Sequence, residues 1–163
     1  MRLALLSLAA AGALLAPAAA PANTSHEGWP KIDGALLMNK QDQSRPLDGR
    51  TIRGHNELLG GHGNDTIYAG PRGDVLWGDY KPSGQPTAQT DRLYGNDGRD
   101  FIYASHGTNL IHAGGGDDYV KAHYGRGIID CGGGRDVLYI SRRAQRSYRI
   151  RHCETVSHKT LGY

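Results

Sequence analysis

The stretch GGHGNDTIY, at residues 60–68, holds three glycines, one aspartate and one isoleucine within nine positions. Glycine loses more conformational freedom on folding than any other residue, so such a cluster is costly to order. It is typical either of a disordered linker or of a backbone bent into shapes that other residues resist. The sequence on either side of this stretch decides between the two interpretations.

The same arrangement recurs with a fixed period. Aliphatic residues lie nine positions apart in two runs, and a spacing of seventeen residues separates Leu76 from Leu93 between the runs. A disordered linker would not keep an aliphatic residue in phase over so many repeats, so the sequence predicts a repeat architecture. The aliphatic positions are Leu58, Ile67 and Leu76 in the first run, and Leu93, Ile102, Ile111, Val120, Ile129 and Leu138 in the second.

Each repeat predicts a short strand followed by a tight turn. The three residues around each aliphatic position form a strand that points one side chain inward. The following loop reverses the chain, which requires the dihedral angles that glycine permits. Each turn of two repeats buries only two aliphatic side chains, a small core for the backbone that it orders. We therefore expect a further source of stability, and the loop aspartates suggest a metal ion.

Residues 51–139 resemble the G-G-x-G-x-D-x-U-x nonapeptides of the RTX, or haemolysin-type, calcium-binding repeats. The resemblance implies an all-β fold, a right-handed parallel β-roll (β-solenoid) of about five turns with a C-terminal capping strand. It also implies that calcium lies between Gly-rich loops stacked on the same side of the roll. Residues 78–90 form an irregular loop within this region.

Counting by eighteen residues separates the loops onto two edges. The first edge is predicted to carry loops 60–65, 78–83, 95–100, 113–118 and 131–136, and the second loops 52–56, 69–74, 88–91, 104–109 and 122–127. Calcium takes about six to eight oxygen ligands, so a site needs two neighbouring loops with close glycine backbones and at least one carboxylate. Loop 113–118 meets this condition with both of its neighbours on the first edge.

We assign the calcium ligands to the glycines and aspartates of these three loops: Gly95, Asp97, Gly98, Asp100, Gly114, Gly116, Asp118, Gly132, Gly134 and Asp136. A third site at Asp65 stays open, because its predicted neighbour is the irregular loop 78–83, where Asp79 can supply a carboxylate. The second edge, which includes Asp74, is expected to bind no metal and to be held by Asn109 side-chain amides. The alternative is that glycine turns carry solvated aspartates and bind nothing.

The N-terminal residues 1–22 predict a signal peptide. Arg2 precedes an apolar run from Leu3 to Leu15 that is too short to span a bilayer, and Ala20-Pro21-Ala22 offers a cleavage site before Asn23. No second apolar run follows, so we expect a secreted, extracellular or cell-surface-associated bacterial protein without a membrane span. An N-terminal segment or cap at 23–50 then precedes the roll.

Residues 140–163 predict a basic C-terminal cap. From residue 142 onward six Lys and Arg residues face only Glu154, so the segment can bind a polyanion or form a solvated end of the domain. SYRIRHCETV, at 147–156, alternates as a half-buried strand does, and we expect it to lie across the last turn with its arginines facing solvent. An even number of cysteines in an exported chain favours a Cys131–Cys153 disulfide over two free thiols.

The sequence contains no H-E-x-x-H or G-x-S-x-G motif, and we expect no enzyme. Outward positions beside the buried aliphatics carry aromatic residues such as Tyr68, Trp77 and Phe101. These can bind a glycan or protein partner, stack across strands, or be covered by residues 29–39. The sequence thus predicts a secreted calcium-binding structural or binding module with no nucleic-acid partner. The alternative is a glycan-binding or adhesion module whose calcium is purely structural.

Overall fold

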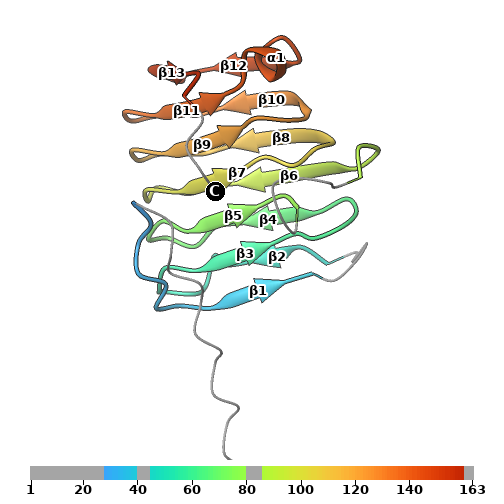
Figure 1. Ribbon diagram of the computed structural model, residues 1–163. Helices are drawn as coiled ribbons and strands as arrows, with labels where there is room; N and C mark the ends of the chain where they lie inside the picture. The colour runs from blue at the N-terminus through green and yellow to red at the C-terminus, as the bar shows by residue number, and fades with distance from the viewer. Residues whose placement is uncertain (1–27, 40–44, 80–85, 160–163) are drawn as a thin grey trace, which may run out of the picture.

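The computed structural model describes residues 28–39, 45–79 and 86–159 of the 163-residue chain. Two parallel β-sheets enclose the core, and the chain passes between them at every half-turn (Figure 1). The result is a β-solenoid of about six turns, which confirms the predicted all-β parallel roll. The predicted signal peptide and its cleavage site lie outside the described residues. Within those residues no helix has the length and apolar character needed to cross a membrane.

The odd-numbered strands form one sheet and the even-numbered strands form the other, each in chain order. The odd sheet contains β1 (Leu36–Met38), β3 (Glu57–Leu59), β5 (Val75–Trp77), β7 (Phe101–Tyr103), β9 (Tyr119–Ala122), β11 (Val137–Ile140) and β13 (Thr155–Ser157). The even sheet contains β2 (Leu47–Asp48), β4 (Thr66–Tyr68), β6 (Thr90–Tyr94), β8 (Thr108–His112), β10 (Arg126–Asp130) and β12 (Tyr148–Arg151). A short helix, α1 (Arg142–Gln145), precedes β12 and is capped by the Ser141 side chain, which accepts a hydrogen bond from the Ala144 N–H.

The core consists of two columns of aliphatic side chains, one from each sheet. All nine aliphatic positions predicted from the period are 0% exposed. In the odd sheet, Leu58, Leu76 and Ile102 pair in register, and the even sheet pairs Ile67 with Leu93 in the same way. Each short strand therefore contributes one inward side chain to a column, as the period-two geometry of a strand requires.

Both ends of the roll extend beyond the predicted repeats. At the N-terminal end, β1 and β2 lie inside the segment 23–50 and continue the two sheets, with Leu37 paired to Leu58 and Leu47 to Ile67. At the C-terminal end, β12 and β13 pair in parallel with β10 and β11. These additions account for a longer solenoid than the repeats alone predicted.

The strand predicted at 147–156 is present as β12, with Tyr148 buried and Arg149 and Arg151 exposed. It does not lie across the last turn but joins the even sheet in register. The predicted disulfide between Cys131 and Cys153 is present, with a Cα–Cα distance of 5.1 Å. It links the last Gly-rich loop to the connection between β12 and β13.

The connection between β5 and β6 overturns the predicted assignment of loops to edges. Asp65 and Asp74 stack on residues 26 positions later, Asp91 and Asp100, whereas the later loops stack at a separation of 18. The seventeen-residue spacing between Leu76 and Leu93 therefore corresponds to one half-turn, with an enlarged connection, 78–89, between β5 and β6. Consequently, the loops before residue 78 share an edge with a different set of later loops from the one predicted.

We call the two edges the aspartate edge and the long-loop edge. The aspartate edge carries loops 49–56, 69–74, 95–100, 113–118, 131–136 and 152–154. The long-loop edge carries loops 60–65, 78–89, 104–107, 123–125 and 141–147. The prediction was right that the three loops 95–100, 113–118 and 131–136 are neighbours. It was wrong for loops 52–56, 60–65 and 69–74, each of which lies on the opposite edge from the one predicted, and for the loop that begins at residue 78, which lies beside loop 104–107.

The N-terminal segment covers much of the outer face of the odd sheet. The Trp29 ring packs edge-on against Trp77, at 5.9 Å between ring centroids, and against Tyr103, at 5.8 Å. The Trp29 indole N–H also donates a hydrogen bond of 2.7 Å to the Tyr103 hydroxyl. Together with Ile32, Trp29 buries Phe101 and its neighbours in a second apolar cluster. The interpretation that residues 29–39 cover outward aromatics is confirmed for this sheet.

On the even sheet the outward aromatics stack on one another. The rings of Tyr68 and Tyr94 are 5.0 Å apart at an angle of 12°, and Tyr94 stacks on His112 at 5.6 Å. The Arg50 guanidinium lies 4.4 Å from the centre of the Tyr68 ring and closes the column. Cross-strand stacking therefore uses the ring faces and leaves ring edges toward solvent.

Candidate metal centre at the aspartate edge

Three Gly-rich loops, 95–100, 113–118 and 131–136, stack directly on one another. The Gly115 N–H donates to the Asn96 carbonyl at 2.8 Å, and the Gly133 N–H donates to the Gly114 carbonyl at 2.8 Å. A side chain at four of the glycines would collide with the backbone of the preceding loop, and all four have positive φ angles, from +96° to +139°. Only glycine permits this spacing and this backbone conformation. The four are Gly114, Gly116, Gly132 and Gly134.

Behind the loops, buried carboxylates form a continuous ladder. Asp118 Oδ1 accepts a hydrogen bond from the Asp100 N–H at 2.8 Å, and Asp136 Oδ1 accepts one from the Asp118 N–H at 2.8 Å. Asp74, on the preceding turn, donates its N–H to Asp100 Oδ1 at 2.6 Å. All four aspartates are 0% exposed.

The ladder includes residues at both ends that the sequence analysis did not assign. Asn56 donates its N–H to Asp74 Oδ1 at 2.7 Å, and Glu154 Oε2 accepts the Asp136 N–H at 2.8 Å. Asp74 was missed because the count placed it on the other edge. Glu154 lies outside the repeats, but it follows Asp136 by 18 residues, the separation that relates each later rung to the next.

The four aspartates fall into two kinds according to their partners. Both oxygens of Asp74 accept hydrogen bonds, including one of 2.6 Å from the Gly70 N–H. Both oxygens of Asp100 likewise accept backbone N–H groups, one of them from Asn96 at 2.9 Å. In contrast, Oδ2 of Asp118 and Oδ2 of Asp136 are buried and have no hydrogen-bond partner within the described chain.

The difference arises four residues before each aspartate. Gly70 and Asn96 occupy this position before Asp74 and Asp100, and each donates its N–H to the aspartate. The equivalent residues before Asp118 and Asp136 are Gly114 and Gly132, whose positive φ angles orient the peptide differently. Two buried carboxylate oxygens are thereby left for a ligand that the protein does not itself provide.

Burial makes the charged form of these aspartates unfavourable. It raises the pKa of Asp118 to about 8, and the neighbouring Asp100 and Asp136 carboxylates add to this effect, while the Asp100 N–H opposes it. Burial likewise raises the pKa of Asp100 to about 7 and raises the pKa of Asp136. A cation beside the ladder would favour the ionised carboxylates and offset the cost of burying them.

The donor set fits a hard cation that takes oxygen ligands. No group of three His, Cys, Asp or Glu side chains converges on one point within residues 28–39, 45–79 and 86–159. A metal between these loops would therefore take most of its ligands from backbone carbonyls and one carboxylate from each loop. Calcium accepts such a mixture, whereas softer transition metals prefer imidazole and thiolate ligands.

The remaining predicted ligands lie in loop 95–100, the first of the three stacked loops. Gly95 packs against the Ala113 carbonyl, and Gly98 against the backbone of loop 69–74. Asp97 is exposed, and its Oδ1 lies beside Gly115 of the next loop. Asp117, one residue before the ladder, is held away from it by a 2.9 Å ion pair with Arg135.

Asp65 lies on the long-loop edge, away from the other predicted ligands. Its N–H donates to Asp91 Oδ1 at 3.0 Å, and its own Oδ1 accepts a hydrogen bond of 2.9 Å from the Asn39 amide. Further along this edge the Asn109 side chain donates to the Ser105 carbonyl at 3.0 Å and accepts from the Ser105 N–H at 2.8 Å. The predicted amide-to-backbone bonds of Asn109 are thus confirmed.

The family model of the RTX calcium-binding nonapeptide repeat matches this chain in four copies, over residues 53–79 and 87–120. The break between the matched segments falls in the enlarged loop 78–89. No significant match was found among curated proteins or among solved structures. The nine-residue period, the parallel solenoid, the stacked glycine loops and the family match agree, and the repeats within residues 53–120 are RTX calcium-binding nonapeptide repeats.

Proposed function

We propose that the protein binds two calcium ions on the aspartate edge, one on each side of loop 113–118, and that these ions support its fold. The observation that carries the proposal is the pair of buried carboxylate oxygens without a partner in the described chain, Oδ2 of Asp118 and Oδ2 of Asp136. The match to the calcium-binding repeat family supports calcium as the ion.

The ligands follow from the positions of the loops. Asp118 and Asp136 would supply the carboxylate oxygens, and the glycine loops would supply carbonyl oxygens. Asp97 and Asp100 lie in the first loop of the stack, where they can complete the outer site. The proposed glycine ligands are Gly95, Gly98, Gly114, Gly116, Gly132 and Gly134. When bound, calcium would supply positive charge beside a ladder that otherwise buries uncompensated carboxylates.

A third site at Asp65 would use Asp79, the expected neighbour, together with Asp91. On the long-loop edge its carboxylate neighbours are Asp91 and Asp79, and the negative charges of Asp65 and Asp79 add to the burial that raises the pKa of Asp91. The calcium stoichiometry of the protein and of an Asp65→Asn variant decides whether this site exists.

We further propose that the protein is a secreted module with a structural or binding role. The N-terminal sequence pattern and the cysteine pair support export. Mass spectrometry of protein recovered from the culture medium should find Asn23 as the first residue. The glycan-binding alternative gains nothing from the aromatic columns, because their ring faces are occupied by neighbouring rings.

Calcium-dependent stability tests the central proposal. Extracellular-type sites bind calcium at about 0.1–1 mM, so each site contributes about 1–2 kcal/mol at a few millimolar free ion. Thermal unfolding followed by circular dichroism should show a higher Tm in calcium than in EDTA. Magnesium should have little effect, because it requires near-octahedral geometry. Equal stability in calcium and EDTA would contradict the proposal.

A further inference from the structure

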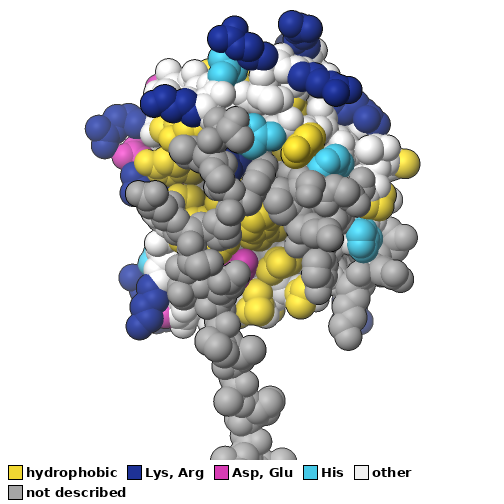
Figure 2. All heavy atoms as spheres, viewed as in Figure 1, with side chains coloured by type: hydrophobic (Ala, Val, Ile, Leu, Met, Phe, Trp, Pro, Cys, Tyr) yellow, Lys and Arg dark blue, Asp and Glu magenta, His cyan; other side chains and the backbone are white. Residues whose placement is uncertain are grey.

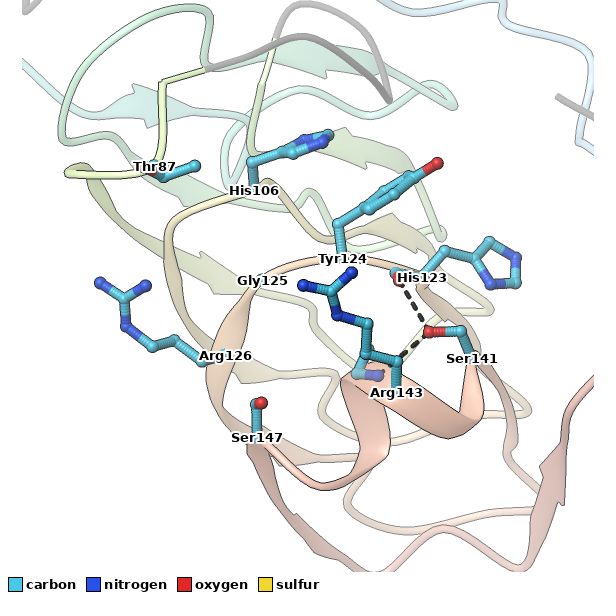
Figure 3. Close-up of a pocket in the computed structure, with 10 residues that line it drawn as sticks. Thr87, His106, His123, Tyr124, Gly125, Arg126, Ser141, Arg143 and Ser147 are labelled. Atoms are coloured by element: carbon cyan, nitrogen blue, oxygen red, sulfur yellow. Dashed lines mark hydrogen bonds between the residues drawn. The ribbon is translucent and has the colours of Figure 1, made fainter.

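An open groove lies at the C-terminal end of the long-loop edge, away from the aspartate edge. Its volume is about 620 Å³, and it is lined by the loops at 104–107, 123–125 and 141–147 together with Thr87 (Figure 3). The Arg143 side chain rises from α1 towards Tyr124, and Arg126 projects from the start of β10 (Figure 3). Nothing in the calcium proposal uses these residues.

The groove is cationic and its charge is not neutralised from within. Its lining includes Arg126, Arg143, His106 and His123, and among the described residues that line it there is no aspartate or glutamate. Neither arginine forms an ion pair with any residue that the structure describes. Of the two histidines, His106 has a carboxylate nearby, Asp79, at 3.9 Å. Exposed guanidinium groups with free donors bind carboxylate, sulfate or phosphate oxygens.

The surroundings of the groove add to its positive potential. Lys and Arg side chains gather over the C-terminal turns of the roll (Figure 2). They belong to the segment after residue 141, in which six Lys and Arg residues accompany a single acidic residue, Glu154. A surface charge of one sign attracts anionic ligands and speeds their association, more strongly at low salt.

An exposed aromatic ring in the lining of the groove, Tyr124, favours anions that also have an apolar face. Tyr124 is 46% exposed, in contrast to the covered aromatic residues of the odd sheet. His106 stacks on it at 4.4 Å between ring centroids, which fixes the orientation of the tyrosine ring. Arg143 extends towards this ring, whereas Arg126 lies further along the groove (Figure 3). The ring and the two arginines together suit an elongated ligand that combines a flat apolar face with negative groups.

We propose that this groove binds an anionic oligosaccharide, whose sugar ring packs against Tyr124 and whose carboxylate or sulfate groups contact Arg126 and Arg143. The site lies on the edge opposite the proposed calcium loops, and binding there does not require that those loops hold calcium.

Calorimetric titration at fixed calcium and low salt tests the proposal. The probes are a short oligogalacturonate, a sulfated oligosaccharide of similar length and a neutral oligosaccharide as control. One or both acidic oligosaccharides should bind, and the neutral one should not. Which acidic oligosaccharide binds shows whether the groove prefers carboxylate or sulfate groups. Replacing both arginines, in Arg126→Ala/Arg143→Ala, should weaken binding by about tenfold or more, because hydrogen bonds to charged groups are the strong ones. Tyr124→Ala should also weaken it.

A charge-matched variant distinguishes specific binding in the groove from nonspecific electrostatic attraction to the protein surface. Arg53→Ala/Arg92→Ala removes the same net charge from exposed positions elsewhere on the roll and should leave affinity within about twofold. If both double variants lose affinity equally, or if no acidic probe binds, the proposal fails. Single-stranded DNA that binds as tightly as the saccharides would also overturn it. If the Arg126→Ala/Arg143→Ala variant does not fold, the single Arg143→Glu variant provides the same test. Calcium titration of each variant is a separate measurement, so failure here is distinguishable from failure of the calcium proposal.

Discussion

Replacing Asp118 by asparagine should remove most of the calcium response without removing the ladder. The carbonyl oxygen of the new side-chain amide would still accept the Asp100 N–H, the hydrogen bond that Oδ1 now makes. The negative charge and the Oδ2 that has no partner in the described chain would be lost. Because burial already raises the pKa of Asp118 to about 8, the Asp118→Asn variant should be no less stable than the natural protein in EDTA.

The size of the effect follows from the position of loop 113–118 between two proposed ions. At a few millimolar calcium the two sites together should contribute about 2–4 kcal/mol. For a domain of this size each kcal/mol shifts Tm by about 3–6 °C, so calcium should raise the Tm of the natural protein by roughly 6–24 °C. In Asp118→Asn this increment should fall to less than half. Differential scanning calorimetry in calcium and in EDTA measures both quantities.

Asp74→Asn is the matched control. Both Asp74 oxygens accept N–H groups, so an amide there would place a donor against donors and should cost about 1–3 kcal/mol. This loss should be the same with and without calcium, and the calcium increment should not change. If Asp118→Asn retained the full increment, or if Asp74→Asn abolished it, the division of the ladder into two kinds of aspartate would be wrong.

Three further predictions concern the whole fold. Burial raises the pKa of Asp100 to about 7 and that of Asp118 to about 8, so the calcium-free fold holds these protons more tightly than the unfolded chain. Its Tm should therefore fall as pH rises from about 4 to 8, while the calcium increment grows; an equal increment at about pH 5 and 8 would contradict this. Reducing the Cys131–Cys153 bond, which closes a separation of 22 residues, should lower the free energy of unfolding by about 3 kcal/mol and weaken calcium binding. Calorimetry with and without reductant tests this, and unchanged values would count against it. Trp29→Ala should lower the free energy of unfolding by about 1–3 kcal/mol, measured by urea unfolding, because the ring contacts with Trp77 and Tyr103 are lost. The calcium stoichiometry should not change. Loss of a calcium site would show that the Trp29 cluster and the calcium loops are coupled, which their contacts do not explain.

The fold was predictable because one signal, the nine-residue period, determines both strand position and side-chain direction. Every aliphatic position that it marked is buried, from Leu58 to Leu138. The turns at the N-terminal end escaped prediction because Leu37, Leu47 and Leu58 are spaced by ten and eleven residues, which breaks the period. Parallel pairing with an established strand tolerates this variation in loop length, but a search for a fixed period does not.

The error in the edge assignment had a visible cause in the sequence. Between Leu76 and Leu93 there is no Val, Ile, Leu, Met or Phe, and Pro82 and Pro86 interrupt the segment. A half-turn without an aliphatic residue would contribute nothing to the core. The seventeen-residue spacing therefore had to be one half-turn with a long loop, and this inference would have placed Asp74 beside Asp100.

The distinction between Asp100 and Asp118 was beyond the sequence analysis. It depends on the direction of one peptide group four residues earlier, in Asn96 for one aspartate and in Gly114 for the other. A glycine in the sequence permits a positive φ but does not require it. Only the folded backbone shows which glycines adopt that conformation and leave a carboxylate oxygen without a hydrogen-bond partner in the described chain.

The enlarged connection at 78–89 interrupts the nine-residue period of the sequence but not the regular stacking of the strands. The strands on either side of it stack in register even though the connection adds eight residues to the usual separation of 18. Length changes at this connection therefore need not disturb either sheet. One extra residue inside loop 113–118 would instead disturb the backbone hydrogen bonds and close glycine contacts that stack this loop on its neighbours. The chain thus has a natural insertion point, where a foreign peptide or a reporter could be displayed while the glycine loops keep their spacing.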